Sequence, residues 1–159
     1  MALSHRILGQ ISIKCFDKHT DPFAGGPLLE ILHNLNISPD AAILHEFTLA
    51  AGGTLDLDLN GTLLQSDGST MNLVKVGGII FQVDDTGGKV SLTPKAAGGV
   101  PGYSTGPSEG LIVYSSGISV WICPQEIPIT AGATDLLTAL ETGGVLGATC
   151  KVMIWGSIS

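Results

Sequence analysis

Charged residues are scarce in this chain. They make up 13% of the 159 residues, against about 25% in an average soluble domain, whereas apolar residues reach 44%. A protein that stays alone in water needs a charged, mixed surface to remain soluble. We therefore predict that other polypeptide subunits cover much of this surface. A surface rich in Gly, Ser and Thr is the alternative, since these residues are also plentiful.

Positive charge is scarcer still. Seven Lys and Arg residues stand against fourteen Asp and Glu residues, so the formal net charge is −7. The few cations are scattered along the chain and form no stripe. A nucleic-acid-binding protein needs clustered Lys and Arg to neutralise phosphates. Direct binding of DNA or RNA is therefore not expected.

Long apolar runs are missing as well. No stretch approaches the ~18 apolar residues of a membrane span, because Lys75, Gln82 and Lys151 interrupt the best candidates. We expect no transmembrane segment and no membrane partner. The first residues lack the apolar region and the small-residue cleavage site of a signal peptide, so no secretory leader is expected.

Cysteine is rare, and catalytic signatures are missing from the sequence. Cys15, Cys123 and Cys150 are far apart and show no spacing typical of a metal site. We predict free thiols that behave as small apolar residues in a reducing compartment. The sequence contains no G-x-S-x-G nucleophile motif and no phosphate-binding glycine loop. We expect neither an enzymatic activity nor a cofactor.

Glycine, in contrast, is abundant, and it divides the chain into short segments. Six Gly-Gly pairs occur, and the runs between them are rich in Val, Ile, Leu and Thr. This pattern is typical of all-β sandwiches and barrels. We predict an antiparallel β-sandwich or jelly-roll-like domain over residues 43–159.

The central stretch of this domain covers residues 44–83. Residues 54–60 alternate between leucine and polar residues, and residues 73–83 are almost continuously apolar. These runs predict two paired strands, the second buried on both faces and bulged at Gly77-Gly78. Residues 65–70 are expected to be a polar connector, and Asn60-Gly61 a turn.

The other segments predict further strands and one helix. Residues 135–142 fit either a helix or a strand, and we favour a strand because the neighbouring segments are strands. Residues 1–42 are expected to hold a strand, a loop and a short helix, forming an arm that contacts neighbours. The helix is predicted over residues 27–34, because proline suits the first helical position and the leucines share one side. The remaining strands are predicted at residues 8–15, 43–49, 89–93, 111–114, 118–123 and 149–155.

One polar pattern resembles a calcium loop. Asp56, Asp58, Asn60 and Asp67 stand at the spacing of oxygen ligands in such loops. The flanking residues alternate as in a strand, not a helix, and an aspartate at the last place is short for bidentate binding. We interpret the first three residues as the outward polar face of a strand, with calcium binding as the alternative.

The last candidates for an interface are two tryptophans and one long loop. Trp121 and Trp155 lie in predicted strands and are expected in the core or at an interface. Residues 94–109 are rich in Gly, Pro and Ser and predict a long exposed loop of the kind that contacts partners. Our interface candidates are Phe23, Leu28, Pro101, Tyr103 and Trp155.

The order of FTLAAGGTLDLDLNG, MNLVKVGGIIFQV, GLIVYSSGISVWICP and TCKVMIWGSIS resembles small virion accessory proteins of tailed bacteriophages. The resemblance covers residues 47–159. Proteins of this kind are β-sandwich or jelly-roll modules that decorate or cement capsids, often as trimers, and they have no catalytic residues.

This resemblance implies a structural virion protein that is made in the host cytoplasm and binds the major capsid protein or other virion subunits. It also implies a homo-oligomer, with a trimer as the expected state. A tail- or fibre-associated structural protein is one alternative. A carbohydrate-binding jelly-roll module is the other, and it would use exposed aromatic residues and calcium.

Overall fold

The computed structural model describes residues 7–15, 29–37, 39–64, 68–84, 88–95, 99–100 and 110–158, with side chains from residue 39 onward except that of Pro124. Within these residues the chain forms twelve β-strands and no helix. The strands are β1 (Ile7–Cys15), β2 (Leu29–Ile37), β3 (Ala41–Leu49), β4 (Thr54–Asp58), β5 (Asn60–Leu64), β6 (Thr70–Asn72), β7 (Lys75–Val83), β8 (Lys89–Pro94), β9 (Leu111–Tyr114), β10 (Ile118–Pro128), β11 (Leu136–Thr142) and β12 (Ala148–Ser157).

The chain forms two compact units, Met1–Ser38 and Pro39–Ser159. A boundary after residue 42, as the sequence predicted, would cut strand β3 near its start. The second unit holds ten of the twelve strands, from β3 to β12. It is the unit in which a core and a surface can be described.

The first unit is a two-stranded antiparallel ribbon of β1 and β2, with Ile7 opposite Ile37 and Cys15 opposite Leu29. The predicted helix over residues 27–34 is therefore wrong, because residues 29–34 belong to β2. An eight-residue apolar pattern cannot separate the helical period from the strand period. Pairing with β1 supplies backbone hydrogen bonds along nine residues, whereas a helix this short is marginal by itself.

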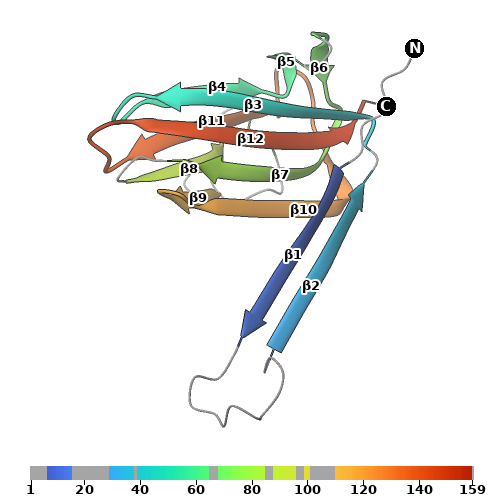
Figure 1. Cartoon of the computed structure of the whole chain (residues 1–159). Helices are drawn as coiled ribbons and strands as arrows, with labels where there is room; N and C mark the ends of the chain where they lie inside the picture. The colour runs from blue at the N-terminus through green and yellow to red at the C-terminus, as the bar shows by residue number, and fades with distance from the viewer. Residues whose placement is uncertain are drawn as a thin grey trace, which may run out of the picture. The chain divides into compact units, whose positions relative to one another are not determined.

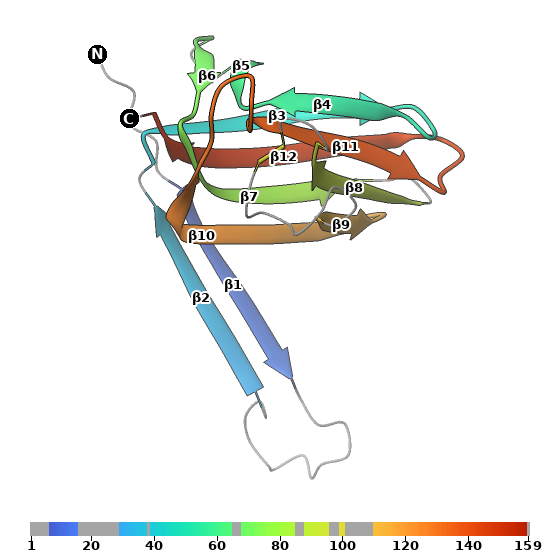
Figure 2. The ribbon, with the colours of Figure 1, turned by 180° about the vertical axis from the view of Figure 1, so that it is seen from behind.

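The second unit contains two four-stranded sheets, with strand orders β10-β7-β12-β3 and β4-β11-β8-β9. Figure 1 shows them as two layers, and Figure 2 shows the same layers from behind. All strand pairs of the described residues are antiparallel. The all-β class is confirmed and the arrangement is consistent with a β-sandwich, while jelly-roll connectivity stays a prediction.

The core lies between these sheets because one face of each strand is apolar. Leu57 of β4, Phe81 of β7 and Val152 of β12 are almost fully buried in one cluster. Strand β11 is confirmed over Leu136–Thr142, where buried and half-buried residues alternate. These residues form a strand and not a helix because β4 and β8 pair with β11 on either side.

The predicted pairing of the two central runs is wrong. Strand β4 pairs with β11, whereas β7 pairs with β10 and β12, so the two runs lie in different sheets. Strands β5 and β6 flank the predicted polar connector over residues 65–70 and form a small ladder of their own, with Thr70 as the first residue of β6. Leu63 and Met71 of these strands are buried in the core.

The predicted bulge in β7 is confirmed. Trp155 of β12 stands opposite Gly78, and the next residue of β12, Gly156, stands opposite Val76, so Gly77 is the extra residue. The two glycines make room for an aromatic ring, because a Cβ atom at Gly78 would collide with the Trp155 indole. Gly77-Gly78 thus lies inside a strand and does not end one.

Candidate functional site

The polar face of β4 is tied to its own sheet. Asp56 accepts hydrogen bonds from Lys95 Nζ at 2.5 Å and from Thr138 Oγ1 at 2.7 Å. These two bonds, first that from Lys95, hold the pKa of the Asp56 carboxyl below its usual range. Both oxygens of this carboxylate therefore already have donors from β11 and from the end of β8.

The other residues of the calcium-like pattern do not converge on Asp56. Asp58 Oδ1 accepts the backbone N–H of Asn60 at 3.0 Å, and Asn60 Nδ2 donates to the carbonyl of Leu73 at 2.7 Å. Asp67 lies outside the described residues. Within the part of the chain that the structure describes, no three His, Cys, Asp or Glu residues gather as metal ligands would. The contacts favour the outward polar strand face.

The lowered pKa of Asp56 predicts a small pH effect. A carboxyl whose folded pKa lies below the ordinary 3.8 stabilises the fold above that value, and the contribution is lost as the pH falls through the folded pKa. We expect Asp56→Asn to lower the melting temperature slightly at neutral pH, since an exposed pair is worth at most about 1 kcal/mol. The difference from wild type should shrink below pH 4. An equal difference at every pH would contradict this role of Asp56.

Of the interface candidates, only one lies in the described part of the chain. Phe23, Leu28, Pro101 and Tyr103 are outside it. Trp155 is only 2% exposed within its own chain, where its ring covers Gly77 and Gly78. The ring is therefore occupied by intramolecular packing.

An apolar row crosses the solvent side of the sheet β10-β7-β12-β3. Val120 stands opposite Ile80, Ile80 opposite Met153, and Met153 opposite Leu44. We call this side of the sheet the outer face. The apolar row spans all four strands. Leu44, at its end, is 68% exposed, and the other three residues are half-buried.

The apolar character of the outer face continues on β10. Ile118 and Ile122 lie two residues from Val120 on either side and so share its face. Ile118 is 63% exposed. The corresponding row across the second sheet is polar, since Asp56, Thr138 and Thr93 stand side by side there. This row of the second sheet therefore differs from the row from Val120 to Leu44, although Ile112 and Tyr114 of β9 are also exposed on the second sheet.

A polar row borders the apolar one on the outer face. Lys151 Nζ lies 2.8 Å from Asp84 Oδ2 and 3.8 Å from Glu46 Oε2, and Gln82 Nε2 donates to Asp84 Oδ1 at 2.8 Å. The Lys151 hydrogen bond lowers the pKa of the Asp84 carboxyl, and Asp84 raises the pKa of Lys151. These groups are largely paired with one another, so the face presents little unpaired charge.

Cys123 and Cys150 are free, as predicted. Cys150 is fully buried in the core and Cys123 is half-buried. Burial, with a smaller contribution from the Asp84 carboxylate, raises the pKa of the Cys150 thiol to about 11. This thiol is protonated at neutral pH and is a poor nucleophile.

Sequence reasoning missed the outer face. Its members are single residues of four different strands, and only the register of the sheet brings them together. One signal was present, because residues 73–83 predicted a strand that is apolar on both sides. Strand β7 does carry apolar residues on both sides, yet Ile80 is not fully covered.

Comparison with known proteins adds no identity. No family model, curated protein or solved structure matches this chain. Within the described residues, none of the secondary structure is a helix long and apolar enough to cross a membrane. The function must therefore be argued from the surface itself.

Proposed function

We propose that this chain is a structural subunit of a larger protein assembly, and that its outer face binds another subunit. The observation that carries this proposal is the apolar row from Val120 to Leu44 on a sheet whose inner side already faces the core. A contiguous apolar patch on a soluble protein marks an interaction site. With 13% charged residues, the chain has few charges with which to shield such a patch.

The outer face by itself is smaller than a stable protein–protein interface. The outer face comprises the apolar row, the polar row beside it and a third row of Ile122, Gly78, Trp155 and Ala42. Four strands spaced about 4.8 Å apart, with these three rows about 6.8 Å apart, cover roughly 400 Å². A stable interface needs about 800 Å² from each partner. The outer face therefore needs further contact surface elsewhere on the chain.

Among assemblies, we propose a phage capsid. In this proposal the chain decorates or cements the capsid by binding the major capsid protein, and it forms a homo-oligomer, with a trimer as the expected state. The support is the strand and glycine order that resembles such accessory proteins, together with the all-β architecture.

The test compares two leucines of similar exposure. Leu44 on the outer face is 68% exposed and Leu64 on β5 is 57% exposed. We expect Leu44→Glu to raise the dissociation constant of the assembly at least about tenfold, because a buried carboxylate without a partner is costly. Leu64→Glu introduces the same charge elsewhere and should leave self-association unchanged. Sedimentation velocity over a concentration series measures both variants.

Melting temperatures provide the folding control, since both leucines are largely exposed and neither variant should unfold. Co-sedimentation with purified phage capsids tests the partner. A wild-type chain that stays monomeric at high concentration and does not bind capsids would contradict the proposal.

A further inference from the structure

The loop between β11 and β12, residues 143–147, presents two apolar side chains to solvent. Val145 is 87% exposed and Leu146 is 89% exposed, the highest values among the large apolar residues described. Single exposed leucines are ordinary. Two adjacent ones at the tip of a loop, in a chain this poor in charge, call for a physical explanation.

The loop is held in place by a buried carboxylate. Glu141 is 0% exposed, and its Oε1 accepts the backbone N–H of Gly144 at 2.7 Å. Its Oε2 accepts the backbone N–H of Gly52 at 2.5 Å, which ties this loop to the turn between β3 and β4. Gly147 closes the loop with a φ of +80°, in close contact with the carbonyl of Leu49. Such anchoring lowers the entropy that binding must overcome.

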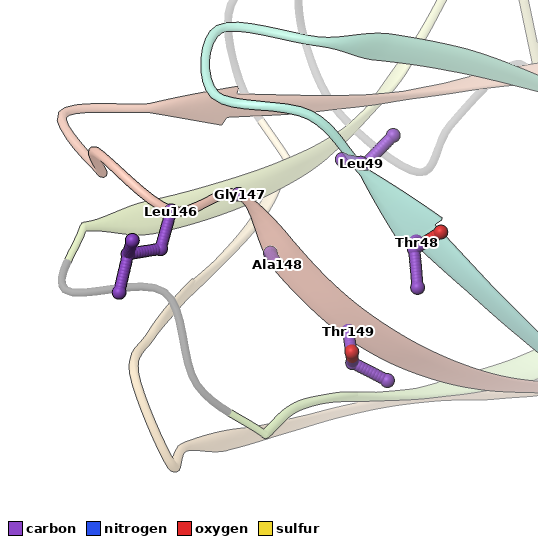
Figure 3. Close-up of a pocket in the computed structure, with 6 residues that line it drawn as sticks. All are labelled: Thr48, Leu49, Leu146, Gly147, Ala148 and Thr149. Carbon is purple, nitrogen blue, oxygen red and sulfur yellow. The ribbon is translucent and has the colours of Figure 1, made fainter.

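A shallow hollow opens directly beside Leu146 (Figure 3). It measures about 150 Å³, room for the four carbon atoms of a leucine side chain, given a share of about 30 Å³ per water molecule. Figure 3 shows Leu146 on the loop that leads into β12, with Thr48 on β3 and Thr149 on β12. The hollow is lined by Thr48, Leu49, Leu146, Gly147, Ala148 and Thr149, none of which carries a charge.

We propose that Leu146 of one copy fills the hollow of a neighbouring copy of this chain. This proposal rests on the proposed function, and it identifies a second copy of the chain as the partner that binds at this end of the outer face. A protruding side chain next to a hollow that can receive it forms a self-complementary patch, as a two-fold contact between identical subunits requires. A contact of this kind pairs two copies, so it is separate from the head-to-tail contacts that would form the proposed trimer. The lack of charge matters because two copies, each with a net charge of −7, repel one another elsewhere.

The hollow also continues the outer face. Thr48 stands opposite Thr149, two residues beyond the pair of Glu46 and Lys151, so both threonines lie on the side that carries Leu44. The outer face alone supplies about half of the area that a stable interface needs. Insertion of Leu146 adds a buried apolar anchor at its end, the kind of contact that dominates binding energy.

The first experiment compares Leu146→Asp with Leu64→Asp, which places the same charge on a leucine that is exposed in a different part of the unit. We expect Leu146→Asp to weaken self-association at least about tenfold, with a melting temperature close to that of wild type at low concentration. Leu64→Asp should associate as wild type does. Sedimentation equilibrium gives both dissociation constants.

The second experiment locates the contact. Chains carrying Leu146→Cys and chains carrying Thr48→Cys, both in a Cys15→Ser, Cys123→Ser background, are mixed and oxidised, and the product is identified by intact mass. We expect a disulfide between the two different chains. The mixture of Leu64→Cys with Thr48→Cys should give none.

The outcomes separate this proposal from the proposed function. If Leu146→Asp associates like wild type while Leu44→Glu dissociates, the loop contact is wrong and the assembly role stands. If wild type is monomeric but binds capsids through Leu146, the identity of the partner as a second copy is wrong. A monomer that binds nothing overturns both.

Discussion

Replacing Trp155 by alanine is expected to lower the free energy of unfolding by about 3–5 kcal/mol, as for other buried aromatic residues. Trp155 is 2% exposed, and its ring fills the space that Gly77 and Gly78 leave on β7. Removing the ring leaves a cavity bordered by backbone, and a bulged strand can close such a cavity only in part. Urea unfolding followed by circular dichroism measures the loss.

Two controls make this prediction specific. Tyr114 is 67% exposed on β9, and Tyr114→Ala should change the stability by no more than about 0.5 kcal/mol. Gly78→Ala should destabilise wild type strongly, but less in the Trp155→Ala background, because the new methyl group collides with the indole. Losses that simply add in the double variant would show that the ring does not occupy this space.

Replacing Glu141 by glutamine is expected to cost about 2–3 kcal/mol. The carboxylate accepts backbone N–H groups from two different loops, at Gly52 and Gly144. An amide offers one oxygen and turns an NH₂ group toward the other donor, which leaves a part-buried N–H without an acceptor. Thermal and urea unfolding measure the loss.

Glu46→Gln is the matched control, since the Glu46 side chain is 62% exposed and its oxygen lies 3.8 Å from Lys151 Nζ. It should melt within about a degree of wild type, because exposed pairs contribute little. Amide hydrogen exchange adds a local readout, in which Gly52 and Gly144 exchange faster in Glu141→Gln than in wild type. Unchanged exchange at both glycines would mean that the carboxylate does not hold the loops.

The strands of the second unit could largely be predicted from the sequence, because each is short, apolar on alternate residues and bounded by turn residues. The polar face of β4 followed from the same alternation, and the bulge followed from two glycines inside an apolar run. The helix over residues 27–34 failed for a complementary reason. Its pattern fits both the helical and the strand period, and pairing with β1, which precedes residues 16–28 in the sequence, decided for a strand.

Local sequence thus determined the all-β class, the scarcity of charge and the positions of most strands, since alternation and turn chemistry act over a few residues. Tertiary structure alone decided which strands pair, because pairing depends on burial summed over distant segments. That pairing placed β4 and β7 in different sheets and aligned Val120, Ile80, Met153 and Leu44 into one row. A surface assembled across four strands by hydrogen-bond register leaves no continuous trace in the order of residues.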